Sequence, residues 1–261
     1  MTSIREPAVA GLFYPGSAIS LADTVRRLLD AAPLEAGPAP KALVVPHAGY
    51  IYSGPVAAAA YTRLRRHREQ YGRVVLLGPS HRVAFDGVAM SSADVFRSPL
   101  GDVAVDPAAI AELALPKLKI ADAPHQLEHS LEVHLPFLQT VLESFVLVPL
   151  VVGHARAEAV ADIIDALWGG PETLIVVSSD LSHYLRYDEA RAIDRLTCTA
   201  IENLHDADIS HEGACGATPL RGLLIAARRR GLRVETLDLR NSGDTAGDKD
   251  RVVGYGSWAL N

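Results

Sequence analysis

Residues 43–54 read LVVPHAGYIYSG, a short apolar run that stops at a proline and is followed at once by His47. The same arrangement returns in residues 74–81, VVLLGPSH, and in residues 174–183, LIVVSSDLSH, each of which ends in a histidine. Continuous apolar runs bounded by Gly, Pro or Ser are typical of strands that are buried on both faces of a parallel sheet. The sequence therefore predicts three buried strands, each followed by a polar turn that carries a histidine.

The three strand-end histidines are His47, His81 and His183. A single histidine at a strand end is more often a hydrogen-bonded structural residue, so the argument rests on the recurrence. Ligands of open α/β sheets bind beyond the carboxyl ends of the strands, where residues far apart in sequence meet. Imidazole is a common metal ligand and a common acid or base. We therefore expect one site at this edge of the sheet.

Helical and extended patterns alternate along the rest of the chain. Ser20 can cap a helix, and Gly54-Pro55 opens another that runs to about Arg66, since proline is tolerated in a first turn. Further helices are predicted over residues 128–142, 155–168, 188–204 and 218–230, strands over 145–152, 234–239 and 252–260, a hairpin within 88–106 and a short helix from Asp106. In the first of these helices, Pro136 either introduces a kink or marks the true start. This alternation predicts one layered α/β domain over residues 1–261, with a central, mostly parallel or mixed sheet flanked by helices.

The composition excludes several classes of protein. Apolar residues make up 49% and charged residues 21%, as in a globular protein with a sizeable core. The formal net charge is −6 and no basic stripe is present, which argues against a nucleic-acid partner. No apolar run approaches the roughly 18 residues of a membrane span, and the N-terminus does not resemble a signal peptide. We expect a cytoplasmic protein that does not enter membranes.

A metal held by two imidazoles needs at least one more ligand, commonly a carboxylate. Asp244 follows the predicted strand over residues 234–239 and offers this carboxylate, with Asp248 and Asp250 as rivals. The alternative is a simple turn, because residues 241–248 are rich in Asn, Ser, Gly and Asp. Spacing alone leaves both interpretations open.

His183 has its own candidate partner, Asp180, three residues earlier. A carboxylate that accepts one ring N–H fixes the histidine tautomer and leaves the other nitrogen free for proton transfer. We expect Asp180 and His183 to form a catalytic acid–base pair. Two alternatives remain: Asp180 caps the turn, or His183 is itself a metal ligand.

Residues 125–134, HQLEHSLEVH, form a second cluster of titratable groups. The order does not match the His-Glu-x-x-His motif of zinc proteases. His129, Glu132 and His134 are expected either to line the pocket or to form a polar helix face.

Cys215 precedes a helix start, where the positive end of the helix dipole would lower the pKa of a thiol. A lone cysteine is weak evidence for a nucleophile, so we expect Cys215 to line the pocket.

Several short motifs together resemble one known family, the Memo family, called AmmeMemoRadiSam system protein B in prokaryotes. The resemblance runs in order through nearly the whole chain. It rests on AVAGLFYP (8–15), VVPHAGYIYSG (44–54), LLGPSH (76–81), EHSLEVHLPFLQ (128–139), SSDLSH (178–183), CG-x-x-P (215–219), NSGD (241–244) and VGYGSWAL (253–260).

The resemblance implies a fold similar to class III extradiol dioxygenases, which are non-haem Fe(II) enzymes. It implies that His47, His81 and Asp244 hold the metal and that His183 is the acid or base. Animal relatives have cysteine, and the dioxygenases glutamate, at the position that this comparison assigns to Asp244. Aspartate suits Fe(II), with copper or zinc as alternatives. The resemblance also implies aromatic side chains around the pocket mouth: Phe13, Tyr14, Tyr50 and Tyr52.

Three functions follow as hypotheses. The first is a metal-binding oxidoreductase with a dioxygenase-like Fe(II) site and an unknown small-molecule or peptide substrate. The second is an adaptor that uses the same pocket to bind a peptide or partner without chemistry; the family name implies a radical-SAM protein and an Amme-domain protein as pathway partners. The third is a zinc-dependent hydrolase that uses the same ligands and a bound water.

Overall fold

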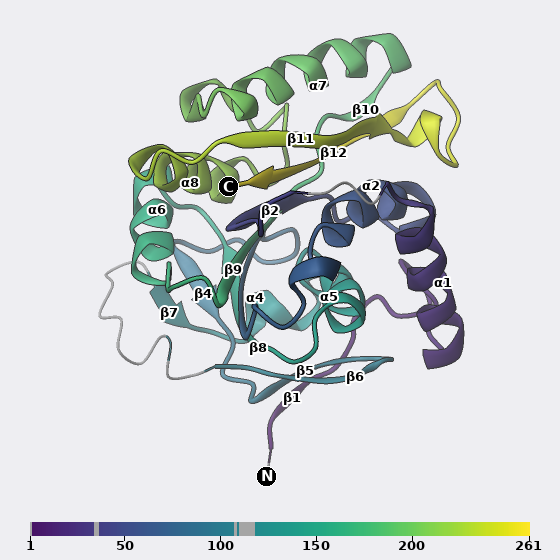
Figure 1. Ribbon diagram of the computed structural model, residues 1–261. Coiled ribbons are helices and arrows are strands. Elements are labelled where there is room, and N and C mark those ends of the chain that lie inside the picture. The colour runs from purple at the N-terminus through teal and green to yellow at the C-terminus, as the bar shows by residue number, and fades with distance from the viewer. Residues whose placement is uncertain (1, 34–36, 107–108, 110–117) are drawn as a thin grey trace.

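The computed structural model describes residues 2–33, 37–106, 109 and 118–261, and its main feature is a large mixed sheet (Figure 1). The strands of this sheet are β2 Ala42–Val45, β3 Arg73–Pro79, β4 Val88–Met90, β7 Leu118–Ile120, β8 Val146–Val152, β9 Thr173–Ser178, β10 His183–Leu185, β11 Val234–Asn241 and β12 Val252–Leu260. They lie in the order β10-β12-β2-β9-β3-β8-β4-β7, and β11 pairs with β12.

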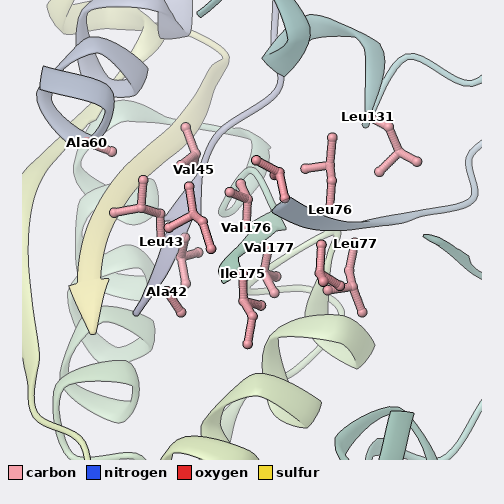
Figure 2. Packing of buried hydrophobic residues seen from close by; sticks show 14 of the residues in the cluster. Ala42, Leu43, Val45, Ala60, Leu76, Leu77, Leu131, Ile175, Val176 and Val177 are labelled. Atoms are coloured by element: carbon pink, nitrogen blue, oxygen red, sulfur yellow. The ribbon is translucent and has the colours of Figure 1, made fainter. Parts of the chain in front are cut away.

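Four neighbouring strands at the centre, β2, β9, β3 and β8, are mutually parallel. Their side chains are buried on both faces because each strand is an almost continuous apolar run. Leu43, Leu76 and Ile175 lie among these buried side chains, which pack closely together in Figure 2. The sequence prediction of a mostly parallel central sheet is confirmed, and the three histidine-bearing strands are β2, β3 and β9.

Helices cover the two faces of the sheet, as Figure 1 shows: α6 and α8 lie on one side, and α1, α2 and α5 on the other. The helices are α1 Ala18–Ala31, α2 Tyr50–Thr62, α4 Ala123–Gln126, α5 Leu135–Val141, α6 Ala157–Ala166, α7 Tyr187–Glu202 and α8 Ala217–Arg229, with single 3₁₀ turns at Arg65–His67, Glu132–His134, Asp206–Asp208 and Ser242–Asp244. The cap of α1 is Ser17, whose hydroxyl accepts from the amide of Ser20, and not Ser20 as expected. Within the described ranges no helix is both long and apolar enough to cross a membrane.

A small second sheet contains β1 Ile4–Arg5, β5 Val95–Ser98 and β6 Gly101–Ala104. Strands β5 and β6 pair as an antiparallel hairpin, which confirms the prediction within residues 88–106. The short helix expected from Asp106 falls largely outside the described residues. This sheet matters for the site because β1 leads into residues 6–14, which contact the segment discussed next.

The predicted helix over residues 128–142 is wrong in its first part. α4 ends at Gln126, residues 128–131 are not helical, and α5 begins only at Leu135, so the following Pro136 marks the true start of the helix. The non-helical stretch crosses the end of β3. A Cβ at Gly78 would lie 2.7 Å from the Ser130 hydroxyl, so glycine permits this close approach. His129 is thereby placed at the edge of the sheet that carries His47 and His81.

Candidate metal centre

Three imidazoles, those of His47, His81 and His129, meet beyond the carboxyl ends of β2 and β3. Each offers a ring nitrogen, and these atoms lie within 4.8 Å of one another. The ring centroids are 5.1 Å apart for His47 and His81, and 4.6 Å for His81 and His129. All three line a cavity of about 570 Å³. The two imidazoles predicted from the strand ends are therefore brought together, and the third comes from the segment that crosses them.

The tautomer of His47 is set by Ser178. The Ser178 hydroxyl donates to the carbonyl of Ser130 at 2.6 Å and lies 2.6 Å from Nδ1 of His47. Because the hydroxyl has a single hydrogen and uses it on the carbonyl, Nδ1–H of His47 is the donor to Ser178. Nε2 of His47 consequently carries a lone pair, which is the form that binds a metal.

His81 is oriented in the same way by Glu128, whose side chain is 1% exposed. The carboxylate lies 2.9 Å from Nδ1 of His81 and accepts the backbone amides of His81, His129 and Ser130. Burial raises the pKa of Glu128, but these hydrogen bonds and the neighbouring imidazole outweigh it and lower the pKa to about 2. The ionised carboxylate accepts Nδ1–H and leaves Nε2 of His81 free to bind a metal.

Two of the three imidazoles, those of His47 and His129, resist protonation. Burial, followed by the nearby imidazoles of His81 and His129, holds the pKa of His47 well below 6.5. Burial also lowers the pKa of His129 to about 4, although Glu128 acts in the opposite direction. In the described chain, Nδ1 of His129 is buried and makes no hydrogen bond. Imidazoles that resist protonation keep a lone pair available, and such nitrogens fit a divalent first-row metal.

Asp244, the carboxylate expected as the third ligand, is not part of this cluster. Its Oδ1 accepts the hydroxyl of Tyr187 at 2.5 Å, and its Oδ2 accepts the amide of Asn241 at 3.1 Å as half of a capping box around a 3₁₀ turn. It lines a separate cavity of about 340 Å³ beside α7. The turn interpretation of this stretch is the one that the structure supports. Asp248 does lie in the wall of the histidine cavity, but outside the cluster.

Asp180 and His183 both line the cavity, although they do not pair with each other. Asp180 Oδ1 accepts the amide of His47 at 2.7 Å, and Oδ2 is 4.0 Å from Nε2 of His47. Burial raises the pKa of Asp180 to about 7. His183 Nδ1 lies 2.8 Å from the carbonyl of Leu181, which can only accept. Nε2 of His183 is therefore the unprotonated nitrogen, and burial lowers the pKa of this imidazole.

The aromatic residues expected at the pocket mouth divide between two cavities. Phe13 and Tyr52 line the histidine cavity. Tyr14 and Tyr50 line a neighbouring groove of about 680 Å³, of which Phe13 is also a wall. Phe13 therefore separates the two spaces.

Glu132 and His134 are buried and do not line the cavity. Glu132 accepts the Tyr14 hydroxyl and the amides of Ala8 and Val9, and forms an ion pair with Arg5. It thus fixes the N-terminal segment that carries Phe13.

His134 reaches the cluster through Ser178. Its Nε2 is 2.9 Å from the Ser178 hydroxyl, and its Nδ1 is 2.9 Å from the hydroxyl of Tyr61. Because Ser178 already donates to a carbonyl, Nε2–H of His134 donates to Ser178 and Nδ1 accepts from Tyr61. His134 therefore supports the serine that orients His47.

Cys215 touches the cluster directly, with Sγ 3.2 Å from Nε2 of His47. The expectation of a lowered thiol pKa is wrong: burial, with the charge of Asp180 second, raises the pKa of Cys215 well above its usual range. The thiol is neutral, and its hydrogen can donate to Nε2. A metal at Nε2 would displace this contact.

A family model described as "Memo-like protein" matches residues 5–259. The chain belongs to the Memo-like protein family. Curated relatives of this Memo-like chain include a MEMO1 family protein of Aquifex aeolicus, 36% identical over 97% of both chains, and one of Aeropyrum pernix, 36% identical over 97% of this chain and 98% of the relative. A third, from Sulfolobus acidocaldarius, is 34% identical over 97% of both.

Among solved structures, the Memo-like chain is similar to an uncharacterized protein, JW3007, of Escherichia coli K12. The TM-score is 0.55 at 12% identity, and the match covers 83% of this chain and 98% of the other. At this identity the similarity concerns the fold alone, and it supports the α/β architecture with helices on both faces of a mixed sheet.

Sequence reasoning missed the roles of two polar residues of this Memo-like site, Glu128 and Ser178. Both are buried and bind histidine ring nitrogens. Glu128 lies directly before His129, and a carboxylate adjacent to a histidine was the available signal. Ser178 ends a buried strand, where a serine is expected to bind something polar.

Proposed function

We propose that this Memo-like protein is a metal-dependent enzyme, with Fe(II) as the metal and oxygen-dependent chemistry on a small chelating substrate as the activity. The observation that carries the proposal is the meeting of three imidazoles, from His47, His81 and His129, at a cavity large enough for a small molecule. The choice of Fe(II) and of a catechol-like substrate follows from the resemblance to class III extradiol dioxygenases. The pathway partners and the cytoplasmic location stay predictions.

The metal, when bound, supplies coordination positions at which a chelating substrate and dioxygen can meet. The chain's own residues have separate tasks. Ser178 and Glu128 hold the imidazoles of His47 and His81 so that Nε2 of each is available. Nε2 of His183 accepts a proton from a substrate hydroxyl, because the other ring nitrogen already donates to a carbonyl. Phe13 and Tyr52 supply aromatic walls against which a planar substrate can pack.

A second candidate function, a zinc-dependent hydrolase, is favoured by the donor set itself. Several catalytic zinc sites use three histidines as protein ligands and leave a fourth coordination position open, whereas non-haem Fe(II) oxygenases commonly use two histidines and a carboxylate. Asp180 is the nearest carboxylate to His47 Nε2 in the cluster region, at 4.0 Å. In the hydrolase, a metal-bound water would be the nucleophile and Asp180 or His183 its base.

The first experiment is metal analysis after anaerobic purification, comparing the wild type with a His47→Ala, His81→Ala double variant. Near-stoichiometric iron in the wild type that disappears in the variant supports the proposal. Zinc in place of iron, with hydrolysis of activated esters, supports the second candidate. If neither the wild type nor the variant contains metal, and neither takes up added Fe(II) or Zn(II), both enzymatic proposals are contradicted and the non-catalytic adaptor is favoured.

Oxygen consumption is the second experiment. Fe(II)-loaded wild type should consume dioxygen with a catechol-bearing substrate, and His183→Ala should retain the metal but lose turnover. Loss of metal from His183→Ala would instead make His183 a ligand.

A further inference from the structure

Among the described residues, a single side chain with a permanent positive charge lines the cavity over the histidine cluster. Its walls are aromatic, with Phe13, Tyr52, Tyr184 and Tyr255 among them. Among the described residues that line it, Arg251 is the sole arginine or lysine. The same wall holds the carboxylates of Asp180 and Asp248, so the arginine is free to recognise a ligand only if neither of them neutralises it.

Arg251 pairs with neither carboxylate. It directly precedes β12 and is exposed, and no carboxylate of the described chain lies within 4.0 Å of its guanidinium, unlike Arg240, which pairs with Asp238. Asp248 lies in the same wall, but its Oδ1 accepts the amides of Asp250 and Arg251 and so holds the turn. The guanidinium is left to contact an aromatic ring, that of Tyr184, with 5.2 Å to the centroid.

Tyr184 is held in an uncommon conformation at this point. Its φ is 59°, in the left-handed region that bulky side chains rarely adopt, at a cost of about 1 kcal/mol or more. It lies where the pairing of β10 with β12 shifts register, between His183 opposite Val253 and Leu185 opposite Val252. Such bulges re-aim a side chain, and here the result is a tyrosine ring at the cavity wall beside the arginine.

We propose that Arg251 is an anion-binding residue of this cavity and that the substrate carries a carboxylate in addition to the group that meets the histidines. The inference rests on the proposed function, since it describes the substrate of the same cavity. A guanidinium presents a planar fork of donors that matches a carboxylate bidentately, and such charge-assisted hydrogen bonds are about twice as strong as neutral ones. The ring of Tyr184 limits the freedom of the arginine before the ligand arrives, which reduces the entropy lost on binding.

The test uses metal-free protein first, so that the histidines cannot bind the ligand through a metal. Phenylpropanoate and its neutral analogue phenylpropanol are titrated by NMR into chelator-treated wild type, Arg251→Gln and Arg156→Gln. The last variant removes an equal charge from an exposed arginine that pairs with Glu158 and does not line the cavity. We expect the wild type and the Arg156 variant to bind the acid about tenfold more tightly than the alcohol, and the Arg251 variant to lose this preference.

An acid preference that persists in Arg251→Gln, or that is absent from the wild type, would overturn the inference. A second series with Zn(II)-loaded protein uses hydrocaffeate and its alcohol, which can chelate the metal. If the chain takes up no metal but the metal-free preference for the acid depends on Arg251, the proposed function fails and the anion site stands. If metal binds and no preference is seen in either series, the anion site alone fails.

Discussion

Replacing Glu128 with glutamine tests the central claim that this carboxylate prepares His81 to bind a metal. One oxygen of Glu128 accepts Nδ1–H of His81 and the amides of His129 and Ser130, and the other accepts the amide of His81. Glutamine has only one acceptor atom. Whichever way the amide is turned, its NH₂ group faces a donor and at least one buried hydrogen bond is lost.

Two effects of this variant can be given magnitudes. Losing a partner that orients a metal-binding histidine typically weakens metal affinity about 10- to 100-fold. An unsatisfied buried amide costs about 1–3 kcal/mol of folding free energy. We therefore expect Zn(II) affinity to fall by at least tenfold, together with a measurable loss of stability.

The assay is a competitive Zn(II) titration against a chelating dye, starting from metal-free protein, at a temperature where every variant is folded. Glu132→Gln is the matched control, since Glu132 is also fully buried in the same segment but binds Arg5, Tyr14 and backbone amides instead of the histidine cluster. We expect the control to lose stability while keeping its metal affinity. Equal affinity in wild type and Glu128→Gln, or an equal loss in both variants, would refute the reasoning.

Four further predictions concern the cluster and its surroundings. Because burial lowers the pKa of His129 to about 4, protons compete with a metal for this imidazole only at low pH, so bound Zn(II) should persist at pH 5. Release near pH 6.5, measured by dialysis, would contradict the burial argument. Asp244→Asn should retain wild-type metal content when it is purified anaerobically and its metal is measured by mass spectrometry, and metal loss would restore Asp244 as a ligand. Gly78→Ala should weaken metal binding severalfold, because the new Cβ would lie 2.7 Å from the Ser130 hydroxyl and displace the segment that carries His129. Unchanged affinity would show that this segment can move without disturbing the site. Burial raises the pKa of Asp194 to about 6, so the folded protein holds a proton that the unfolded chain releases above 3.8, and the stability of the wild type falls as pH rises from about 4 to about 6. Urea unfolding should therefore show that the stability of Asp194→Asn, relative to the wild type, increases by up to about 3 kcal/mol between pH 4 and pH 7. A difference that does not change with pH would refute this reasoning.

The sequence by itself determined the central sheet and two residues of the candidate centre. Buried parallel strands are marked locally by continuous apolar runs, and the polar residues that follow them must lie at one edge when the strands are neighbours. β2, β9 and β3 are neighbours, so His47 and His81 meet, and Asp180 and His183 line the same cavity.

Tertiary structure decided the third imidazole. Residues 128–134 carry apolar and polar residues at spacings that suit a helix, and only the close approach of Ser130 to Gly78 and the hydrogen bonds of Glu128 show why the first part is not helical. The same holds for Asp244, because an Asn-Ser-Gly-Asp turn can serve a cap or a ligand equally well, and the packing against Tyr187 decides for the cap. Strand patterns are local properties of the chain, whereas the partner of a polar side chain lies far away in sequence and is fixed only when the chain has folded.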